Sequence, residues 1–207
     1  KLLQELLEPD SVVAISGGST MAAVAEEMPI LPFNPTVVPA RGGVGAVVEY
    51  QANVIASVLA ERLRGTYKML HLPDGLSQDS LHMLMTCEPQ IKEIGDLISR
   101  TDVLLFGIGT AMRMADQRHI ADDVRKKLVD NHAVGEALGQ YCDMDGKLIY
   151  STNNIGLSLP DVAKVPNVIA VAGGQEKASA IIGVMRACQK GILIIDEQAA
   201  EGMRQLL

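Results

Sequence analysis

The sequence is poor in aromatic residues, in cysteine and in positive charge, and it has no long apolar segment. Trp is absent and aromatic residues make up 3% of the 207 positions, which argues against surfaces that stack nucleic-acid bases or sugar rings. Lys and Arg number 18 against 25 Asp and Glu, a net charge of -7, and an extended nucleic-acid surface needs far more basic residues. Any bound anion must therefore be held by local groups.

The few cysteines and histidines show no metal-binding or disulfide pattern. Three cysteines lie far apart with no CxxC pair, which is typical of a reducing cytoplasm, and four histidines lack HxxxH or HExxH spacing. We expect no metal site and no cofactor. No apolar run approaches the roughly 20 residues of a membrane span, and no signal peptide is visible, so we expect a soluble, cytoplasmic chain.

Short apolar runs alternate with helix-like stretches along the chain, and 48% of the residues are hydrophobic. This alternation predicts one α/β domain over residues 1–207, with a mainly parallel sheet flanked by helices. The expected strands are 12–15, 36–40, 66–72, 102–108, 133–141, 167–172 and 192–195. The expected helices are 20–28, 44–64, 77–85, 90–99, 111–118, 120–129, 176–189 and 197–207.

Two regions depart from this rhythm. Residues 134–142, 143–147 and 148–150 read as a strand, a turn containing Gly146 and a second extended run, which predicts a hairpin excursion from the main sheet. Residues 1–7 are a leucine-rich helical heptad that begins without an initiator Met. We expect this start to be the cut end of a larger protein.

Four glycine-rich turns follow apolar runs. A strand that turns through glycines into a helix points unpaired N–H groups and the positive end of the helix dipole at one spot, which suits an anion. Several such spots predict more than one phosphate. The turns are Ser-Gly-Gly-Ser-Thr at 16–20, Ala-Arg-Gly-Gly-Val-Gly at 40–45, Gly-Ile-Gly-Thr-Ala at 107–111 and Ala-Gly-Gly-Gln-Glu-Lys at 172–177.

The known nucleotide patterns do not fit these turns. GxxxxGK[ST] is absent, and GxGxxG is started by Gly107 and Gly109 but continues with Met112 where a small residue is required. The hydroxyls of Ser19 and Thr20 can add donors to a phosphate; the alternative is that they only cap a helix. Repetition of the pattern with Thr110 favours the phosphate interpretation.

Three charged residues are further candidates. Arg41 precedes two glycines at a strand end, where its guanidinium can clamp phosphate oxygens, although a surface salt bridge is the alternative. Lys177 lies in the first turn of a predicted helix, where a cation is unfavourable without an anion nearby; an exposed Lys beside Glu176 is equally compatible. Glu136, a carboxylate between two glycines, can accept hydrogen bonds from sugar hydroxyls, or it is a structural cap or an edge-strand residue.

Taken in order, these turns and Val-Gly-Glu at 134–136 resemble the effector-binding domain of SorC-type bacterial transcriptional regulators. The resemblance spans nearly the whole chain. It implies a fold similar to ribose-5-phosphate isomerase and glucosamine-6-phosphate deaminase, used to bind a phosphorylated sugar without converting it. It also implies an N-terminal helix-turn-helix domain, absent from this chain, that binds operator DNA, and assembly into homodimers and tetramers. For members that repress glycolytic genes, the implied effector is fructose-1,6-bisphosphate.

The resemblance also implies a set of ligand-binding residues. One phosphate would lie at Gly17, Gly18, Ser19 and Thr20; Arg41, Gly42 and Gly43 would flank the ligand, with Gln51 one or two turns into the next helix. Gly109, Thr110 and Ala111 would form another loop of the pocket, Glu136 would orient hydroxyls, and Lys177 would reach a phosphate. Arg113 and Arg118 are both near enough in sequence to help, and the sequence does not choose between them.

A sugar-phosphate isomerase or deaminase on the same fold is the competing hypothesis. Such chemistry needs a positioned base, and Glu136 and Asp143 are the only appealing candidates. The Asp-Gly-Ala-Asp-Glu-like run of the isomerases is missing, and residues 143–146 are better explained as a turn. A purely structural module would leave the glycine turns unexplained. We therefore expect a sensor and not an enzyme.

Overall fold

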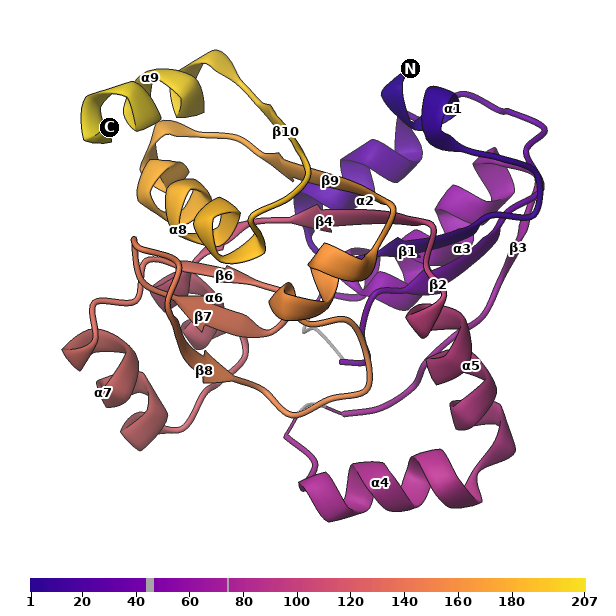
Figure 1. Ribbon diagram of the computed structural model, residues 1–207, viewed down its shortest axis with the longest axis horizontal. Coiled ribbons are helices and arrows are strands. Elements are labelled where there is room, and N and C mark those ends of the chain that lie inside the picture. Colours follow the sequence, from indigo (N-terminus) through magenta and orange to yellow (C-terminus); the bar gives the residue numbers. More distant parts are fainter. Residues whose placement is uncertain (44–46, 74) are drawn as a thin grey trace.

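A computed structural model describes residues 1–43, 47–73 and 75–207, and it is built around one six-stranded parallel sheet (Figure 1). The strand order is β10-β9-β4-β1-β2-β3, and every neighbouring pair is parallel. The predicted α/β class and the mainly parallel sheet are confirmed. The strands are β1 (Val12–Ile15), β2 (Thr36–Pro39), β3 (Thr66–Tyr67), β4 (Val103–Gly107), β9 (Asn167–Ala172) and β10 (Ile192–Ile195).

The central strands are apolar on both faces because helices or a second sheet cover each side. Val13 and Ile15 of β1 pack against the first layer, and Ala14 between them packs against the opposite layer. The first layer consists of α1 (Leu2–Leu6), α2 (Ser19–Glu26) and α3 (Ala52–Arg62). The opposite layer contains α5 (Pro89–Ser99), α8 (Ala178–Cys188) and a small antiparallel sheet.

The remaining helices lie at the periphery. Figure 1 shows α4 (Gln78–Cys87) extending away from the main sheet beyond α5, and α9 (Glu197–Leu206) beside α8. Helices α6 (Ala111–Gln117) and α7 (Asp122–Asp130) cover the small sheet. Short 3-10 turns occur at η1 (Val48–Tyr50), η2 (Leu159–Lys164) and η3 (Gln175–Lys177). Among the described residues, no helix has both the length and the apolar character of a membrane span.

The predicted hairpin excursion is a four-stranded antiparallel sheet in the order β5-β6-β7-β8. Its strands are β5 (Gly109–Thr110), β6 (Gly135–Ala137), β7 (Gln140–Cys142) and β8 (Leu148–Ser151). The prediction of one strand over 133–141 is wrong, because the chain reverses at Leu138 and Gly139. Their φ angles of 51° and 76° are typical of a two-residue hairpin turn.

Two other predicted elements are shorter than expected. The strand predicted over 66–72 stops at Tyr67, because the N–H and the carbonyl of Leu70 bond to the side chain of Asn53 (2.9 and 3.1 Å). The helix predicted over 44–64 begins at Ala52, after a 3-10 turn. The first three residues of that predicted helix, Val44 to Ala46, and the end of the second glycine turn lie outside the described residues.

Two of the three cysteines belong to the core. Cys142 and Cys188 are buried and Cys87 is exposed. Burial raises the pKa of Cys142 and of Cys188 to about 12, so both thiols stay protonated at neutral pH. Their role in this fold is packing.

Candidate ligand-binding site

The sheet order places a topological switch point between β1 and β4. From β1 the chain builds outward through β2 and β3, whereas from β4 it builds outward on the other side through β9 and β10. In open parallel sheets, ligands bind where the loops leaving such neighbouring strands diverge at their carboxyl ends. Ser16 Oγ joins the two strand ends here by accepting a hydrogen bond from Gly107 N (3.1 Å). We take the space between the loops that leave these two strand ends as the candidate site and call it the crevice.

The turn after β1 presents the first turn of α2 to the crevice. Gly18, with φ +114°, is the N-cap of α2, so Ser19 and Thr20 are its first two residues. No side chain caps this helix, and the interpretation of Ser19 or Thr20 as the cap is therefore wrong. Uncapped N–H groups and the helix dipole make this turn suitable for an anion.

Gly17 is required by the close approach of a neighbouring segment. A Cβ at this position would lie 2.8 Å from the carbonyl oxygen of Tyr50. The adjacent Gly18 N donates to that same oxygen (2.9 Å). The residues before α3 therefore hold the glycine turn in place.

Arg41 follows β2 and lies almost buried between the main sheet and the small sheet. Its side chain is 7% exposed, and Nη2 donates to Thr152 Oγ1 (2.8 Å). Its backbone forms an isolated antiparallel bridge with Gly156. Arg41 is thus a nearly buried charge beside the crevice, with a described hydrogen bond to Thr152.

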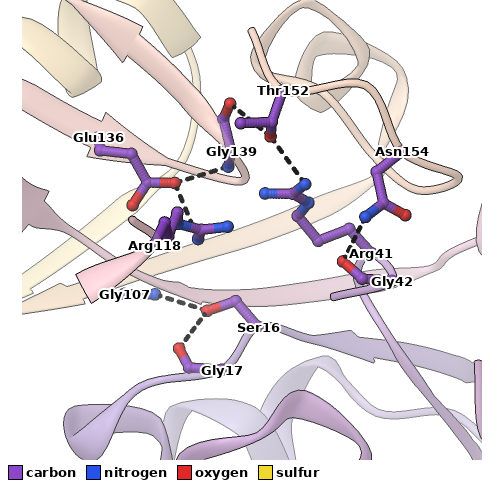
Figure 2. A network of polar contacts seen from close by, with 10 residues as sticks. All are labelled: Ser16, Gly17, Arg41, Gly42, Gly107, Arg118, Glu136, Gly139, Thr152 and Asn154. Carbon is purple, nitrogen blue, oxygen red and sulfur yellow. Dashed lines mark hydrogen bonds and ion pairs between the residues drawn. The ribbon is translucent and has the colours of Figure 1, made fainter. Parts of the chain in front are cut away.

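Glu136 and Arg118 form an ion pair that faces Arg41 across the candidate site (Figure 2). Glu136 lies in β6, an interior strand of the small sheet, and is 3% exposed, so it is not an edge-strand residue. Its Oε1 accepts from Arg118 Nη2 (3.2 Å) and from Gly139 N (2.6 Å). A charged pair of this kind fixes the carboxylate in one orientation.

Gly139 lies between the Glu136–Arg118 pair and Arg41 and contacts both sides. Its N–H contacts Glu136, its carbonyl accepts from Thr152 Oγ1 (3.0 Å), and a Cβ placed on it would lie 1.8 Å from Arg41 Nη1. Figure 2 shows the guanidinium groups of Arg41 and Arg118 directed toward the same space above Ser16 and Gly17. Among the residues that the structure describes, the network drawn there has two positive charges and one negative charge, a balance that favours an anionic ligand.

The buried hydroxyl of Tyr141 shares this electrostatic environment. Tyr141 lies opposite Glu136 in the β6–β7 pair. Burial and, next, the charge of Glu136 raise the pKa of Tyr141 above its ordinary range, whereas Arg118 and Arg41 lower it. The tyrosine therefore stays protonated and can only act as a neutral group at the back of the site.

The turn after β4 is not an open loop. Gly109 and Thr110 form β5 and pair with Glu136 and Gly135, and the N–H of Ala111 donates to the carbonyl of Val134 (3.0 Å). The expected anion loop here is thus largely occupied by its own backbone partners. Gly109 still lies beside the site, because a Cβ on it would be 3.9 Å from Glu136 Oε2.

Several other predicted residues have a different place from the one expected. Gln51 is the N-cap of α3 and does not lie inside that helix. Gly42 N donates to Ile155 O (2.9 Å), so this amide is engaged within the fold, and Gly43 adopts φ +138°. Arg113 is exposed on α6. Of the two arginines between which the sequence does not choose, only Arg118 contacts the described network.

Lys177 belongs to the neighbouring loop after β9. It ends η3 and is the N-cap of α8, so it does not lie in the first turn of a long helix as predicted. The described contacts associate this loop with Asp196 and not with Arg41 or Arg118. Because β9 is the neighbour of β4, the loop still opens at the same edge of the sheet.

Sequence reasoning missed Ser16, Gly139, Thr152 and Asn154. Ser16 was visible as the first residue of the glycine turn, and the polar run 151–154 after an apolar stretch was a signal for a loop at the site. Asn154 Nδ2 donates to Gly42 O (2.9 Å), which ties that run to the loop after β2. Gly139 carried no signal while residues 133–141 were interpreted as one strand.

The fold and the candidate site together are those of a ligand-binding domain, and comparison with known proteins identifies its family. Residues 1–204 match the family described as "Putative sugar-binding domain". The chain belongs to this family, the sugar-binding domains of SorC/DeoR-type transcriptional regulators.

Individual members of this family are similar to the chain in sequence and in structure. The chain is 40% identical over 193 residues to the central glycolytic genes regulator of Bacillus subtilis, covering 92% of this chain and 56% of that protein. The solved structure described as "putative SorC family transcriptional regulator from Enterococcus faecalis" has a TM-score of 0.88 at 38% identity, covering 98% of this chain and 83% of that one. The full-length sorbitol operon regulator SorC of Klebsiella pneumoniae shares the fold, with a TM-score of 0.85 at 22% identity over 98% of this chain and 67% of that one. The chain spans little more than half the length of the B. subtilis relative.

Proposed function

We propose that this domain senses a phosphorylated sugar, with fructose-1,6-bisphosphate favoured, and that it belongs to a repressor of glycolytic genes. The observation that carries the proposal is the convergence of Arg41 and Arg118 above Ser16 and Gly17, in the turn that leads to the uncapped start of α2 (Figure 2). The relative that regulates central glycolytic genes supports the choice of pathway.

Each chemical part of such a ligand has a matching group. One phosphate binds at the first turn of α2, where Gly17, Gly18, Ser19 and Thr20 supply N–H and hydroxyl donors. Arg41 and Arg118 supply bidentate donors for phosphate oxygens. Glu136, already fixed by Gly139, accepts hydrogen bonds from sugar hydroxyls. Lys177 attracts the second phosphate from the next loop.

The regulatory output requires parts beyond this chain. In this proposal a helix-turn-helix domain preceding the sensor binds operator DNA, and the effector weakens that binding. The sensor domains associate as homodimers and, in the whole protein, as tetramers. The relatives named as transcriptional regulators support this arrangement.

Catalysis by an isomerase or deaminase is the alternative that this site favours less. The carboxylate of Glu136 is engaged by Arg118 and Gly139 N. Asp143, the other candidate base, accepts from Asp145 N (3.0 Å) and Lys147 N (2.9 Å) within the β7–β8 turn. Both carboxylates therefore accept hydrogen bonds from other groups of the fold, whereas a general base must be able to reach a proton of the substrate.

Thermal unfolding with a panel of mono- and bisphosphorylated sugars tests the proposal. Ligand at about 100 times its Kd adds roughly 2.7 kcal/mol to the native state, which raises the Tm of a domain of this size by about 5–10 °C. We expect this shift with fructose-1,6-bisphosphate. We expect Arg118→Ala to abolish it and the matched variant Arg113→Ala, on the same helix, to retain it.

The same samples separate the sensor from the enzyme. Phosphorus NMR of the domain incubated with each sugar phosphate should show no new product. If no member of the panel raises the Tm, the sensor hypothesis is wrong; if product accumulates at an enzymatic rate, the catalytic alternative replaces it.

A further inference from the structure

The loop after β9 donates hydrogen bonds to a carboxylate of the protein itself. The carboxylate of Asp196, at the end of the neighbouring strand β10, accepts from Gly174 N at 2.9 Å through Oδ2 and at 3.1 Å through Oδ1. Gly173 leaves room for it, because a Cβ there would lie 2.7 Å from Oδ2. The glycine pair that the sequence offers to a phosphate is therefore filled by a side chain 22 residues further along.

Asp196 also caps helix α9, and this interaction fixes the position of its side chain. It is the N-cap of α9, and its Oδ1 accepts from Ala199 N (2.8 Å). Hydrogen bonds from Ala199 N and Gly174 N and the charge of Lys177 lower the pKa of Asp196. The group is a carboxylate at neutral pH, and Lys177 lies within its electrostatic reach.

We propose that Asp196 is an affinity- and specificity-determining residue of the ligand site, an internal anion that competes with a ligand phosphate for Gly174 N and Lys177. This inference rests on the proposed sugar-phosphate function. A backbone N–H makes one strong hydrogen bond at a time, and two anions beside one amide repel each other. A phosphate that binds this loop must displace Asp196 from Gly174, whereas an uncharged hydroxyl can donate to the carboxylate where it stands.

Displacement does not require α9 to unfold. Ala199 N and Gly174 N are separate donors to Asp196, and the bond from Ala199 N lies within the helix start. A phosphate at the loop therefore breaks the hydrogen bonds between Gly174 N and Asp196 while the cap of α9 persists.

The test is the affinity of Asp196→Asn for fructose-1,6-bisphosphate by isothermal titration calorimetry. Asn keeps a capping oxygen for Ala199 N but removes the negative charge. Binding should tighten at least fivefold relative to the wild-type domain. Glu197→Gln removes the same charge from the exposed neighbouring position and should leave Kd unchanged within twofold.

A measurement on the unaltered domain accompanies the variants. In ¹⁵N NMR spectra, saturating ligand should shift the Gly174 amide strongly and leave the Ala199 amide in place. Equal or weaker binding by Asp196→Asn, or an unmoved Gly174 amide, overturns the competition while the sensor function stands. Absence of fructose-1,6-bisphosphate binding to all three proteins overturns this sugar as the effector and this inference with it, whereas the panel of sugar phosphates decides the sensor function itself.

Discussion

Gly139 is the residue on which the geometry of the two arginines depends. Its φ of +76° is a conformation that side chains other than glycine rarely adopt, and the space of its missing Cβ is taken by the guanidinium of Arg41. Through its N–H it also holds Glu136, the partner of Arg118. Gly139 thus sets the spacing between Arg41 on one side of the proposed site and the Glu136–Arg118 pair on the other.

Gly139→Ala should therefore damage both stability and binding. Gly75, with φ +82° and nothing within 4 Å of its Cβ position, provides the control, because alanine there has only the left-handed strain of about 1–2 kcal/mol. Displacing Arg41 from Thr152 should cost Gly139→Ala about 1–3 kcal/mol more in the free energy of unfolding, measured in urea. Sugar-phosphate affinity should fall at least tenfold in Gly139→Ala and stay unchanged in Gly75→Ala. Equal losses in the two variants would contradict this role.

At the scale of elements, helix α3 fixes the segment that follows β3. Asn53 is 6% exposed, and its amide bonds to both the N–H and the carbonyl of Leu70. The side chain of Asn53 supplies the partners that a neighbouring strand would otherwise give to Leu70. Because the backbone of Leu70 bonds to this side chain of α3 and not to a neighbouring strand, β3 is only two residues long.

Asn53→Leu should consequently lower the free energy of unfolding by about 1–3 kcal/mol, because it leaves two buried backbone groups of Leu70 without partners. For a domain of this size each kcal/mol corresponds to a decrease in Tm of about 2–4 °C. Ser57→Ala, which removes a hydroxyl bonded only to Val54 O within α3, should change Tm by less than 2 °C at that scale. A Tm of Asn53→Leu equal to that of the wild type would mean that Leu70 is held by other contacts.

The sequence predicts elements whose pattern is local and misses those that tertiary contacts decide. The strands of the main sheet and most helices follow from apolar runs and their spacing, as at β1 and α2. The turn at Leu138 and Gly139 was hidden, because Leu-Gly is not one of the Asn-Gly or Asp-Gly pairs that signal a two-residue hairpin turn. Likewise, the association of Asp196 with Gly174 and of Arg41 with Thr152 joins segments far apart in the chain, which no local pattern encodes.

At the scale of the whole molecule, the proposed site lies where the two halves of the main sheet diverge. The half β1-β2-β3 contributes Ser16, the start of α2 and Arg41, and the half β4-β9-β10 leads to the small sheet with Glu136 and to the Lys177 loop. A ligand bound between them contacts both halves and the small sheet. Such a ligand stabilises their relative arrangement, which is what a sensor needs if it is to change the behaviour of attached domains.

The central claim is that this crevice binds a phosphorylated sugar, and a crystal structure of the domain soaked with fructose-1,6-bisphosphate tests it most directly. The account predicts one phosphate within hydrogen-bond distance of the first N–H groups of α2, with Arg41 or Arg118 on phosphate oxygens and Glu136 on a sugar hydroxyl. Density for the ligand at any other place, or an empty crevice at saturating ligand, would contradict it.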